Sequence, residues 1–279
     1  MSPDNTRNNS LYYDLLRHPL MLSVLENISP LYGKVSKNIS DTSAKTKSEV
    51  KKQTQEYLRN LASSDRSLSF KIKYNNEVFQ HISNLTHSVE RIEMTPIFLR
   101  RYPKSKTYEQ NNISLHRWIQ YHYASFLITT TSVYDTALLL TNAVFMLGIE
   151  PKKCSHKTIV KHERIKETSV KPVLEQLDAI IEVYREPRHL FAHRSVLPNL
   201  DFLDDLESMR FTAKAQEEFN VDMPASIHPV IVEDLYQMER RNLIQTIKAE
   251  AVKITDETKR FFSALLPIYT EISGLESLG

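Results

Sequence analysis

The amino-acid sequence predicts an all-α protein in which most helices form an antiparallel bundle. Three observations favour this class. Apolar residues recur at helical spacing over long stretches, so each helix has one apolar stripe to bury. Only 4 of the 279 residues are Gly, which argues against a turn-rich β fold. The stripes are long and mostly continuous, which favours antiparallel packing of neighbouring helices.

The N-terminal third has the least regular pattern. Residues 11–28 predict a short helix interrupted by a proline, and residues 34–56 predict a polar helix or a mobile segment. Residues 67–74 alternate apolar and polar side chains, a pattern typical of a strand. Residues 76–93 carry a clear helical stripe, and we expect Pro96 and the threonine before it to end that helix.

A polar connection over residues 100–112 is the best place for a domain boundary. We therefore expect an N-terminal helical segment over residues 1–110 and a helical bundle over residues 111–279. The role of the N-terminal segment stays open between sensing, support of a dimer and selection of a substrate.

The longest apolar stripe, over residues 113–147, predicts the first helix of the bundle, with Gly148 as its left-handed C′ residue. A second helix is expected to begin near Pro172. It should break or kink at Pro187, because proline has no N–H to bond to the carbonyl four residues back. Two more helices are expected over residues 200–219 and 230–266, joined by a loop at 220–229.

Bulk composition limits the class of protein. Cys154 is the only cysteine, so no disulfide forms within the chain, and a reducing compartment is expected. The polar start has no apolar signal core, and no stretch reaches the ~20 apolar residues of a membrane helix. We therefore expect a cytoplasmic protein. The net charge of +2 neither requires nor excludes nucleic acid, because local basic clusters matter more than the sum.

One short string concentrates cationic and imidazole side chains. Residues 184–194 read YREPRHLFAHR and contain three arginines and two histidines. Arg188 and His193 are separated by four residues, and the small Ala192 precedes the histidine. This pattern resembles the motif of ribonucleases of the HEPN superfamily, in which an Arg is followed after four to six residues by a His. His189 stands where the family often has a polar residue, commonly Asn.

The resemblance extends beyond the motif to a HEPN-like bundle over about residues 113–270. It implies a metal-independent endoribonuclease that uses no cofactor and acts on RNA such as tRNA or mRNA. Arg188 and His193 would be catalytic, while Arg185, His189 and Arg194 would bind phosphates or orient the pair. The family resemblance also implies a two-fold homodimer with one composite groove, a role as a toxin or phage-defence effector, and control by an antitoxin or another regulatory protein.

The residue types suit this chemistry without reference to the family. Cleavage of RNA by its own 2′-OH needs a base for that proton and an acid for the leaving 5′-oxygen. Histidine serves both roles because its ordinary pKa is ~6.5. Arginine stays charged and can bind two phosphate oxygens as charge develops. The product would carry a 2′,3′-cyclic phosphate.

Several alternatives compete with this interpretation. His193 could be a structural histidine, and Arg188 could pair with Glu186 or with an acid on another helix. The domain could be a catalytically inactive HEPN-like module that binds a protein or nucleic-acid partner, or the basic residues could bind a nucleotide. His189 and His193 have the i, i+4 spacing of zinc ligands, but no Glu follows His189 as in zinc proteases.

Three other features of the sequence bear on a site. Arg117 and His122 match the same short motif, but five positions on a continuous helix place them about 140° apart. Asp135 is either exposed or turned toward the motif. The aromatic residues of the long helix are expected to be packing residues, with base stacking as the alternative; they are Trp118, Tyr121 and Tyr123.

Overall fold

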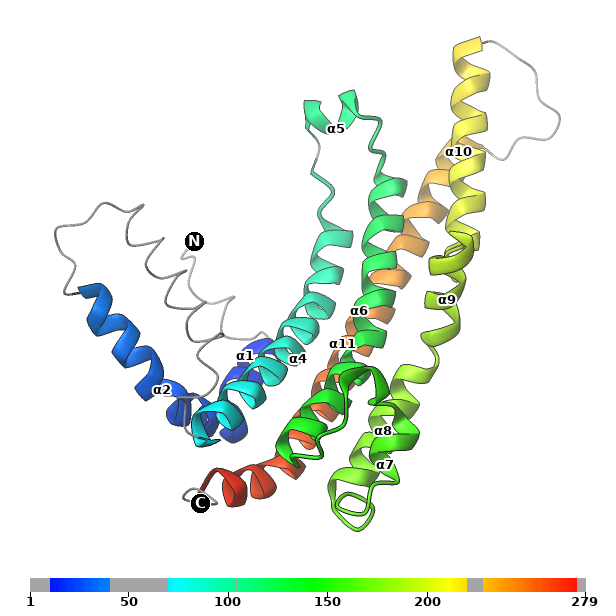
Figure 1. Cartoon of the computed structure of the whole chain (residues 1–279). Coiled ribbons are helices and arrows are strands. Elements are labelled where there is room, and N and C mark those ends of the chain that lie inside the picture. The colour runs from blue at the N-terminus through cyan, green and yellow to red at the C-terminus, as the bar shows by residue number, and fades with distance from the viewer. Residues whose placement is uncertain (1–10, 41–69, 104, 220–227, 275–279) are drawn as a thin grey trace. The chain divides into compact units, whose positions relative to one another are not determined.

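A computed structural model describes residues 11–40, 70–103, 105–219 and 228–274, including the side chains of all but residues 30–40 and 216–219. Within these ranges the regular secondary structure is helical and contains no strand, so the all-α prediction is confirmed (Figure 1). The elements are α1 (Leu11–Leu16), α2 (Pro19–Ser40), α4 (Phe70–Arg100), α5 (Lys106–Gln110), α6 (Leu115–Val144), the 3-10 turn η2 (Pro151–Lys153), α7 (His156–Val160), α8 (Val170–Glu182), α9 (Arg185–Arg194), α10 (Asp201–Phe219) and α11 (Pro229–Gly274).

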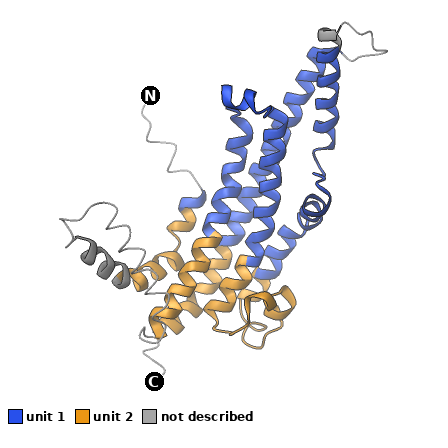
Figure 2. Cartoon of the chain, turned by 45° about the horizontal axis from the view of Figure 1, so that its top comes forward, with its two compact units in different colours: residues 1–13, 86–135, 174–258 blue, residues 14–85, 136–173, 259–279 orange. Residues whose placement is uncertain are grey.

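The chain forms two compact units (Figure 2). Unit 1 comprises residues 1–13, 86–135 and 174–258, and unit 2 comprises residues 14–85, 136–173 and 259–279. The three longest helices, α4, α6 and α11, each contribute one part to unit 1 and another to unit 2. Helices α9 and α10 belong wholly to unit 1.

In unit 1 the predicted apolar stripes are buried, as helical periodicity requires. The buried side chains of this unit include Val89, Ile92, Leu99, Ile119, Phe126, Leu127, Leu177, Leu203, Tyr236 and Ile247. The C-terminal end of α4 is held by side chains from two other helices. The guanidinium of Arg240 donates to the Leu99 carbonyl at 2.9 and 2.7 Å, and the Trp118 indole donates to the Phe98 carbonyl at 2.9 Å. These bonds satisfy carbonyls that have no partner within their own helix.

In unit 2, the end of α6 corrects one sequence prediction. The left-handed C′ residue is Met146, with φ of 51°, and not Gly148. The Leu147 amide reaches back to the Asn142 carbonyl at 3.0 Å and the Met146 amide to the Ala143 carbonyl at 3.1 Å, which is the Schellman arrangement. Gly148 also has positive φ, 67°, but lies two residues later, in the loop that the Asn142 side chain holds through the backbone of Ile149.

Helix α4 corrects two predictions. Residues 70–74 are the first residues of α4 and not part of a strand, while residues 67–69 lie outside the described residues. In the helix, the rings of Phe70 and Tyr74 stack one turn apart. The helix also continues through Pro96 to Arg100. The missing N–H at Pro96 costs one bond to Ile92, but Ile92 and Leu99 are both fully buried on either side, so packing keeps the helix intact.

The remaining helices follow the sequence with shifted ends. α10 matches the predicted 200–219. α11 begins at Pro229 and passes Pro267, ending eight residues later than predicted, at Gly274. Of the predicted 220–229 loop, residues 220–227 lie outside the described residues, as do residues 41–56 of the polar segment at 34–56. Among the described helices, none combines the length and apolar character that a bilayer crossing requires.

Candidate active site on helix α9

Helix α9 carries all five site residues predicted from the sequence. It begins after a break at Val183 and Tyr184, three residues earlier than the break predicted at Pro187. Pro187 instead occupies the first turn of α9, where its missing N–H costs nothing because that N–H has no helical partner. Ser195 ends the helix in the left-handed conformation, with φ of 55°, and its amide bonds to the Phe191 carbonyl.

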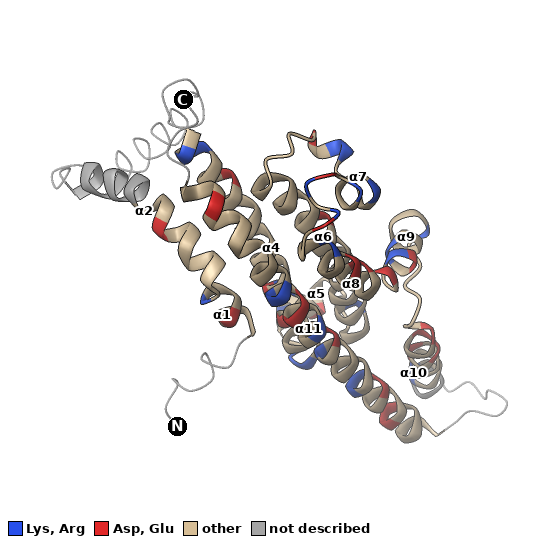
Figure 3. Ribbon diagram, turned by 90° about the horizontal axis from the view of Figure 1, so that it is seen from below, with Lys and Arg blue, Asp and Glu red and all other residues tan. Residues whose placement is uncertain are grey.

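The start of α9 is anchored by Arg185. Its guanidinium donates to the carboxylates of Asp178 and Glu182 on α8 and lies over the ring of Tyr134 on α6, 5.5 Å from the centroid. Figure 3 shows acidic positions of α8 beside basic positions of α9. Burial opposes the charge on Arg185, but the hydrogen bonds and attraction of the two carboxylates outweigh it, so the pKa of Arg185 is raised.

Tyr184, the residue before α9, is a second anchor. Its ring meets the edge of Phe126 on α6, with centroids 5.5 Å apart and planes at 90°. Burial first, and then the charge of Glu250 on α11, raise the pKa of the Tyr184 phenol. The hydroxyl therefore stays protonated and hydrogen-bonds to Glu250. Three helices thus fix the point at which α9 leaves α8.

The rest of α9 turns its polar side chains to solvent. Arg188, His189, His193 and Arg194 are all exposed. The imidazole rings of His189 and His193 lie one turn apart, with centroids 4.4 Å apart. Within the described part of the chain, none of the four side chains makes a hydrogen bond or an ion pair, so Arg188 does not pair with Glu186.

Arg188 and His193 do not contact each other within one chain. They lie five positions apart on a regular helix, which places them about 140° apart around its axis. Arg188 faces the side on which α6 places Asp135. Partial loss of water raises the pKa of the Asp135 carboxyl, while the charges of Arg185 and Arg188 lower it and leave the pKa above its ordinary value. Asp135 is exposed, the first of the two positions considered from the sequence, and the charges of Arg185 and Arg188 act on its carboxyl.

Arg117 and His122, the second match to the motif, lie in different environments. Arg117 is exposed and donates to the Asn112 carbonyl at 3.2 Å. His122 is half-buried, with its ring stacked on Phe98 at 4.8 Å. Burial lowers the pKa of His122, and its Nε2 atom has no hydrogen-bond partner among the described residues.

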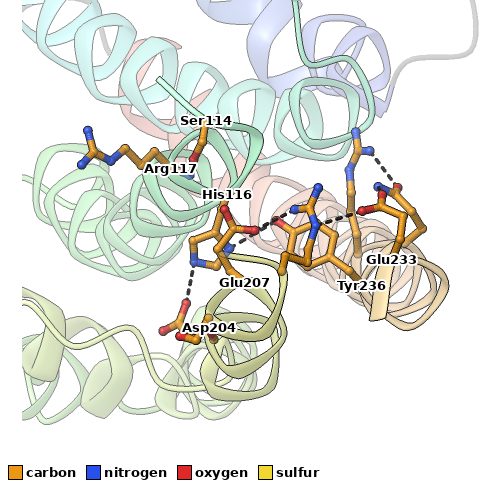
Figure 4. Close-up of polar contacts among 11 residues, drawn as sticks. Ser114, His116, Arg117, Asp204, Glu207, Glu233 and Tyr236 are labelled. Atoms are coloured by element: carbon orange, nitrogen blue, oxygen red, sulfur yellow. Dashed lines mark hydrogen bonds and ion pairs between the residues drawn. The ribbon is translucent and has the colours of Figure 1, made fainter. Parts of the chain in front are cut away.

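A polar cluster that the sequence did not reveal lies elsewhere in unit 1 (Figure 4). His116 of α6 contacts the Tyr236 hydroxyl at 3.2 Å through Nδ1 and the Asp204 carboxylate at 2.8 Å through Nε2. Arg210 adds ion pairs to Glu207 at 2.7 Å and to Glu233 at 2.9 Å. This cluster links α6, α10 and α11. No sequence signal identifies it, because its members are up to 120 positions apart.

The fully buried Tyr236 gives this cluster a structural role. Burial raises the pKa of the Tyr236 phenol, so its hydroxyl stays protonated, and the Arg210 guanidinium covers the ring at 4.4 Å. His116 and Tyr236 thus satisfy each other, and Glu207 and Glu233 satisfy Arg210, between packed helices.

The α9 residues lie on an open surface. Clefts of about 360 and 480 Å³ lie between α10 and α11 and between α4 and the end of α6, and neither is lined by an α9 residue. In the described ranges, no group of three His, Cys, Asp or Glu side chains is arranged to hold a metal ion. An open basic helix can meet a large substrate more readily than it can enclose a small one.

The fold and the exposed motif helix define an all-α protein with an Arg–His pair on a short, anchored helix. A family model described as Cthe2314-like HEPN matches residues 74–259, about two thirds of the chain. The chain therefore belongs to this HEPN family, and the resemblance found in the sequence is confirmed. The match begins within α4, ahead of the boundary predicted near residue 110, which stays a prediction. Neither the curated proteins nor the solved structures include a match.

Proposed function

We propose that this protein is a metal-independent endoribonuclease that cleaves RNA by attack of the 2′-OH and leaves a 2′,3′-cyclic phosphate. One observation carries the proposal. Arg188 and His193 are exposed, and neither makes a hydrogen bond or an ion pair among the described residues, although nearby Arg185 is fully engaged. A structural histidine or arginine would have such partners. Side chains without hydrogen-bond or ion-pair partners among the described residues, on a helix that others hold in place, are available to bind a phosphodiester.

Each residue has a distinct role in the proposed reaction. His193 takes the 2′-OH proton or protonates the leaving 5′-oxygen, and the adjacent His189 ring is available to orient the phosphate. Arg188 holds the charge that develops on the phosphate oxygens. Arg194 adds a phosphate contact, while Arg185 orients the helix through α8. The substrate would be RNA, with tRNA and mRNA as the candidate classes.

A two-fold homodimer would complete this site. One chain presents Arg188 and His193 about 140° apart, so a second copy of α9 facing the first would supply the opposite group across one groove. Large apolar residues bracket α9 on the surface, which supports a contact there: Val183 is 65% exposed, Val196 45% and Phe202 49%. The roles as a toxin or phage-defence effector, and control by an antitoxin or regulatory protein, are part of the proposal as family expectations.

The test is cleavage of a tRNA mixture and of a synthetic single-stranded RNA in EDTA. The wild type should cut, and Arg188→Ala and His193→Ala should each lower the rate by at least about a hundredfold, the usual scale of a lost acid–base or charge contribution. Mass spectrometry should find 2′,3′-cyclic ends, and 2′-deoxy substitution at the cut position should block cleavage.

Matched controls are Arg241→Ala and His87→Ala, an exposed arginine and an exposed histidine on α11 and α4. Both should cut at the wild-type rate, and circular dichroism should find all four variants folded. Absence of cleavage by the pure wild type would favour the inactive binding module. Cleavage that requires a divalent metal would contradict the mechanism.

A further inference from the structure

Exposed rings on α4 and α6 form a continuous surface in unit 1. Tyr121 is 70% exposed and Phe98 36%. Single exposed apolar residues are common, but these two flank one imidazole. Phe98 stacks on the His122 ring at 4.8 Å, and Tyr121 meets the same ring edge-on at 5.2 Å. Trp118 completes the group, 4.2 Å from the His122 centroid.

This aromatic group is held rigidly. The Trp118 indole bonds to the Phe98 carbonyl at 2.9 Å, which joins α6 to the end of α4. The Tyr102 ring contacts Trp118 at 6.2 Å, and the Tyr102 hydroxyl donates to the Ile113 carbonyl. Tyr123, the third aromatic residue considered from the sequence, is buried and is a packing residue. Tyr121 alone projects its ring freely from this fixed base.

Arginines without acidic partners border the rings. Arg91 lies on the α4 stripe that includes Phe98, and Arg101 directly follows the last residue of α4. Arg117 lies one turn before Tyr121 on α6. Arg91 and Arg101 make no side-chain hydrogen bond or ion pair in the described part of the chain, and Arg117 bonds only to a backbone carbonyl. Figure 4 shows Arg117 directed away from the acidic cluster around His116. By contrast, Arg185 and Arg210 of the same unit are paired with carboxylates.

The α6 part of this surface leads to the candidate site. At 100° per residue, Arg117, Ile128 and Asp135 fall within about 20° on α6, and Tyr121 within about 40°. All four are exposed. Burial raises the pKa of the Asp135 carboxyl, and the charges of Arg185 and Arg188 on α9 lower it. A ligand lying along this stripe would extend from Tyr121 to the motif, about 21 Å along the helix.

We infer that this surface, the α4–α6 face (Arg91, Phe98, Arg101, Arg117, Tyr121 and Ile128), binds the single-stranded part of the RNA next to the cleaved bond. Exposed rings accept any base by stacking, and unpaired arginines bind the phosphates between them. The choice of RNA as the ligand rests on the proposed function. A second copy of the chain fits poorly, because a two-fold contact would place the arginines that border this face against their own copies.

The experiment measures binding without cleavage. His193→Ala protein is titrated against a fluorescent single-stranded RNA of twenty uridines and against a duplex of equal length. Tyr121→Ala should weaken single-strand binding about tenfold, within the range of one lost base stack. Arg101→Ala combined with Arg117→Ala should weaken it further and lower the slope of log affinity against log salt by about 1.4, since single strands give ~0.7 for each phosphate contact.

Phe211→Ala on α10 and Arg241→Ala on α11 are matched controls, because both side chains are exposed outside the face. They should leave the affinity unchanged. Unchanged binding in the Tyr121 and arginine variants would overturn the inference, as would equal affinity for duplex. A change of oligomeric mass in place of RNA affinity would also overturn it and assign the face to a protein partner. RNA binding through this face with no cleavage by wild type would overturn the proposed function, while the assignment of the face to single-stranded RNA would stand.

Discussion

At the scale of single residues, the molecule uses arginine and histidine in two different ways. Arg185 and Arg240 are engaged by carboxylates or backbone carbonyls and join helices. His116 does the same between Asp204 and Tyr236. Arg188 and His193 have the same chemistry but no such partners among the described residues. Residue type alone does not separate these roles, whereas contacts do.

His122 makes stability depend on pH. Burial lowers its pKa, so the folded chain keeps the ring neutral. The unfolded chain takes up a proton at the ordinary pKa of ~6.5, so stability is lost as the pH falls through that value. His122→Phe should reduce the loss of melting temperature between pH 7.5 and 5.5. It should also add about 1 kcal/mol at pH 7.5, because the buried Nε2 has no partner.

The control for this prediction is His87→Phe, at an exposed position on the same side of α4 as Arg91. It should change neither melting temperature nor its pH dependence. Identical shifts for His122→Phe at both pH values would mean that protonation of this ring does not contribute to acid sensitivity.

At the scale of elements, α9 is short and depends on its neighbours. A helix of 10 residues is marginal by itself in water, and α9 has no fully buried residue. Its order comes from the first turn, where Arg185 and Tyr184 bind α8, α6 and α11. The geometry of the proposed site therefore depends on contacts at one end of one helix.

We expect Arg185→Ala to loosen α9 without unfolding the bundle. The half-exposed ion pairs contribute about 1 kcal/mol, so amide exchange in residues 188–194 should speed up roughly fivefold. Arg185→Lys should give an intermediate effect, because it keeps the charge but loses the fork that reaches two carboxylates. Hydrogen exchange with mass spectrometry makes the measurement.

Arg194→Ala is the matched variant, since Arg194 lies on the same helix and its side chain makes no hydrogen bond or ion pair among the described residues. It should leave exchange in α9 unchanged. Equal acceleration in the two variants would show that α9 is not anchored through Arg185.

At the scale of the whole molecule, the proposed dimer makes a prediction that no single chain can satisfy. Arg188→Ala and His193→Ala proteins should each be inactive. Mixed after unfolding and refolding together, they should regain up to a quarter or so of wild-type activity, because about half of the dimers are mixed and each holds one intact Arg–His pair across the two-fold axis. RNA cleavage and native mass spectrometry measure activity and composition.

The doubly substituted chain Arg188→Ala, His193→Ala, mixed with wild type in the same way, is the control. It places both defects on one chain, so the mixed dimers hold no intact pair, and activity should fall to about a quarter, below the half that dilution alone would give. No recovery in the mixture of single variants would place the complete site within one chain or remove the dimer from the proposal.

The long apolar stripes of α6 and α11 were predictable because helical periodicity depends on residues that are close together along the chain. The motif was predictable because Arg188 and His193 lie in one short string. The ends of the helices were harder to predict from the sequence. Pro96 is expected to end a helix, yet burial of Ile92 and Leu99 keeps α4 continuous. Met146 adopts the left-handed C′ position that Gly148 was expected to fill.

The sequence by itself determined the helical class, the family resemblance and the candidate pair, because each depends on residues close together along the chain. Tertiary structure decided which cations remain available for a ligand. Arg185 and Arg188 are three positions apart and chemically alike, but α8 places two carboxylates on the first and none on the second. Glu182 lies three positions before Arg185, but Asp178 reaches Arg185 only because of the angle at which α9 leaves α8, and local spacing does not determine that angle.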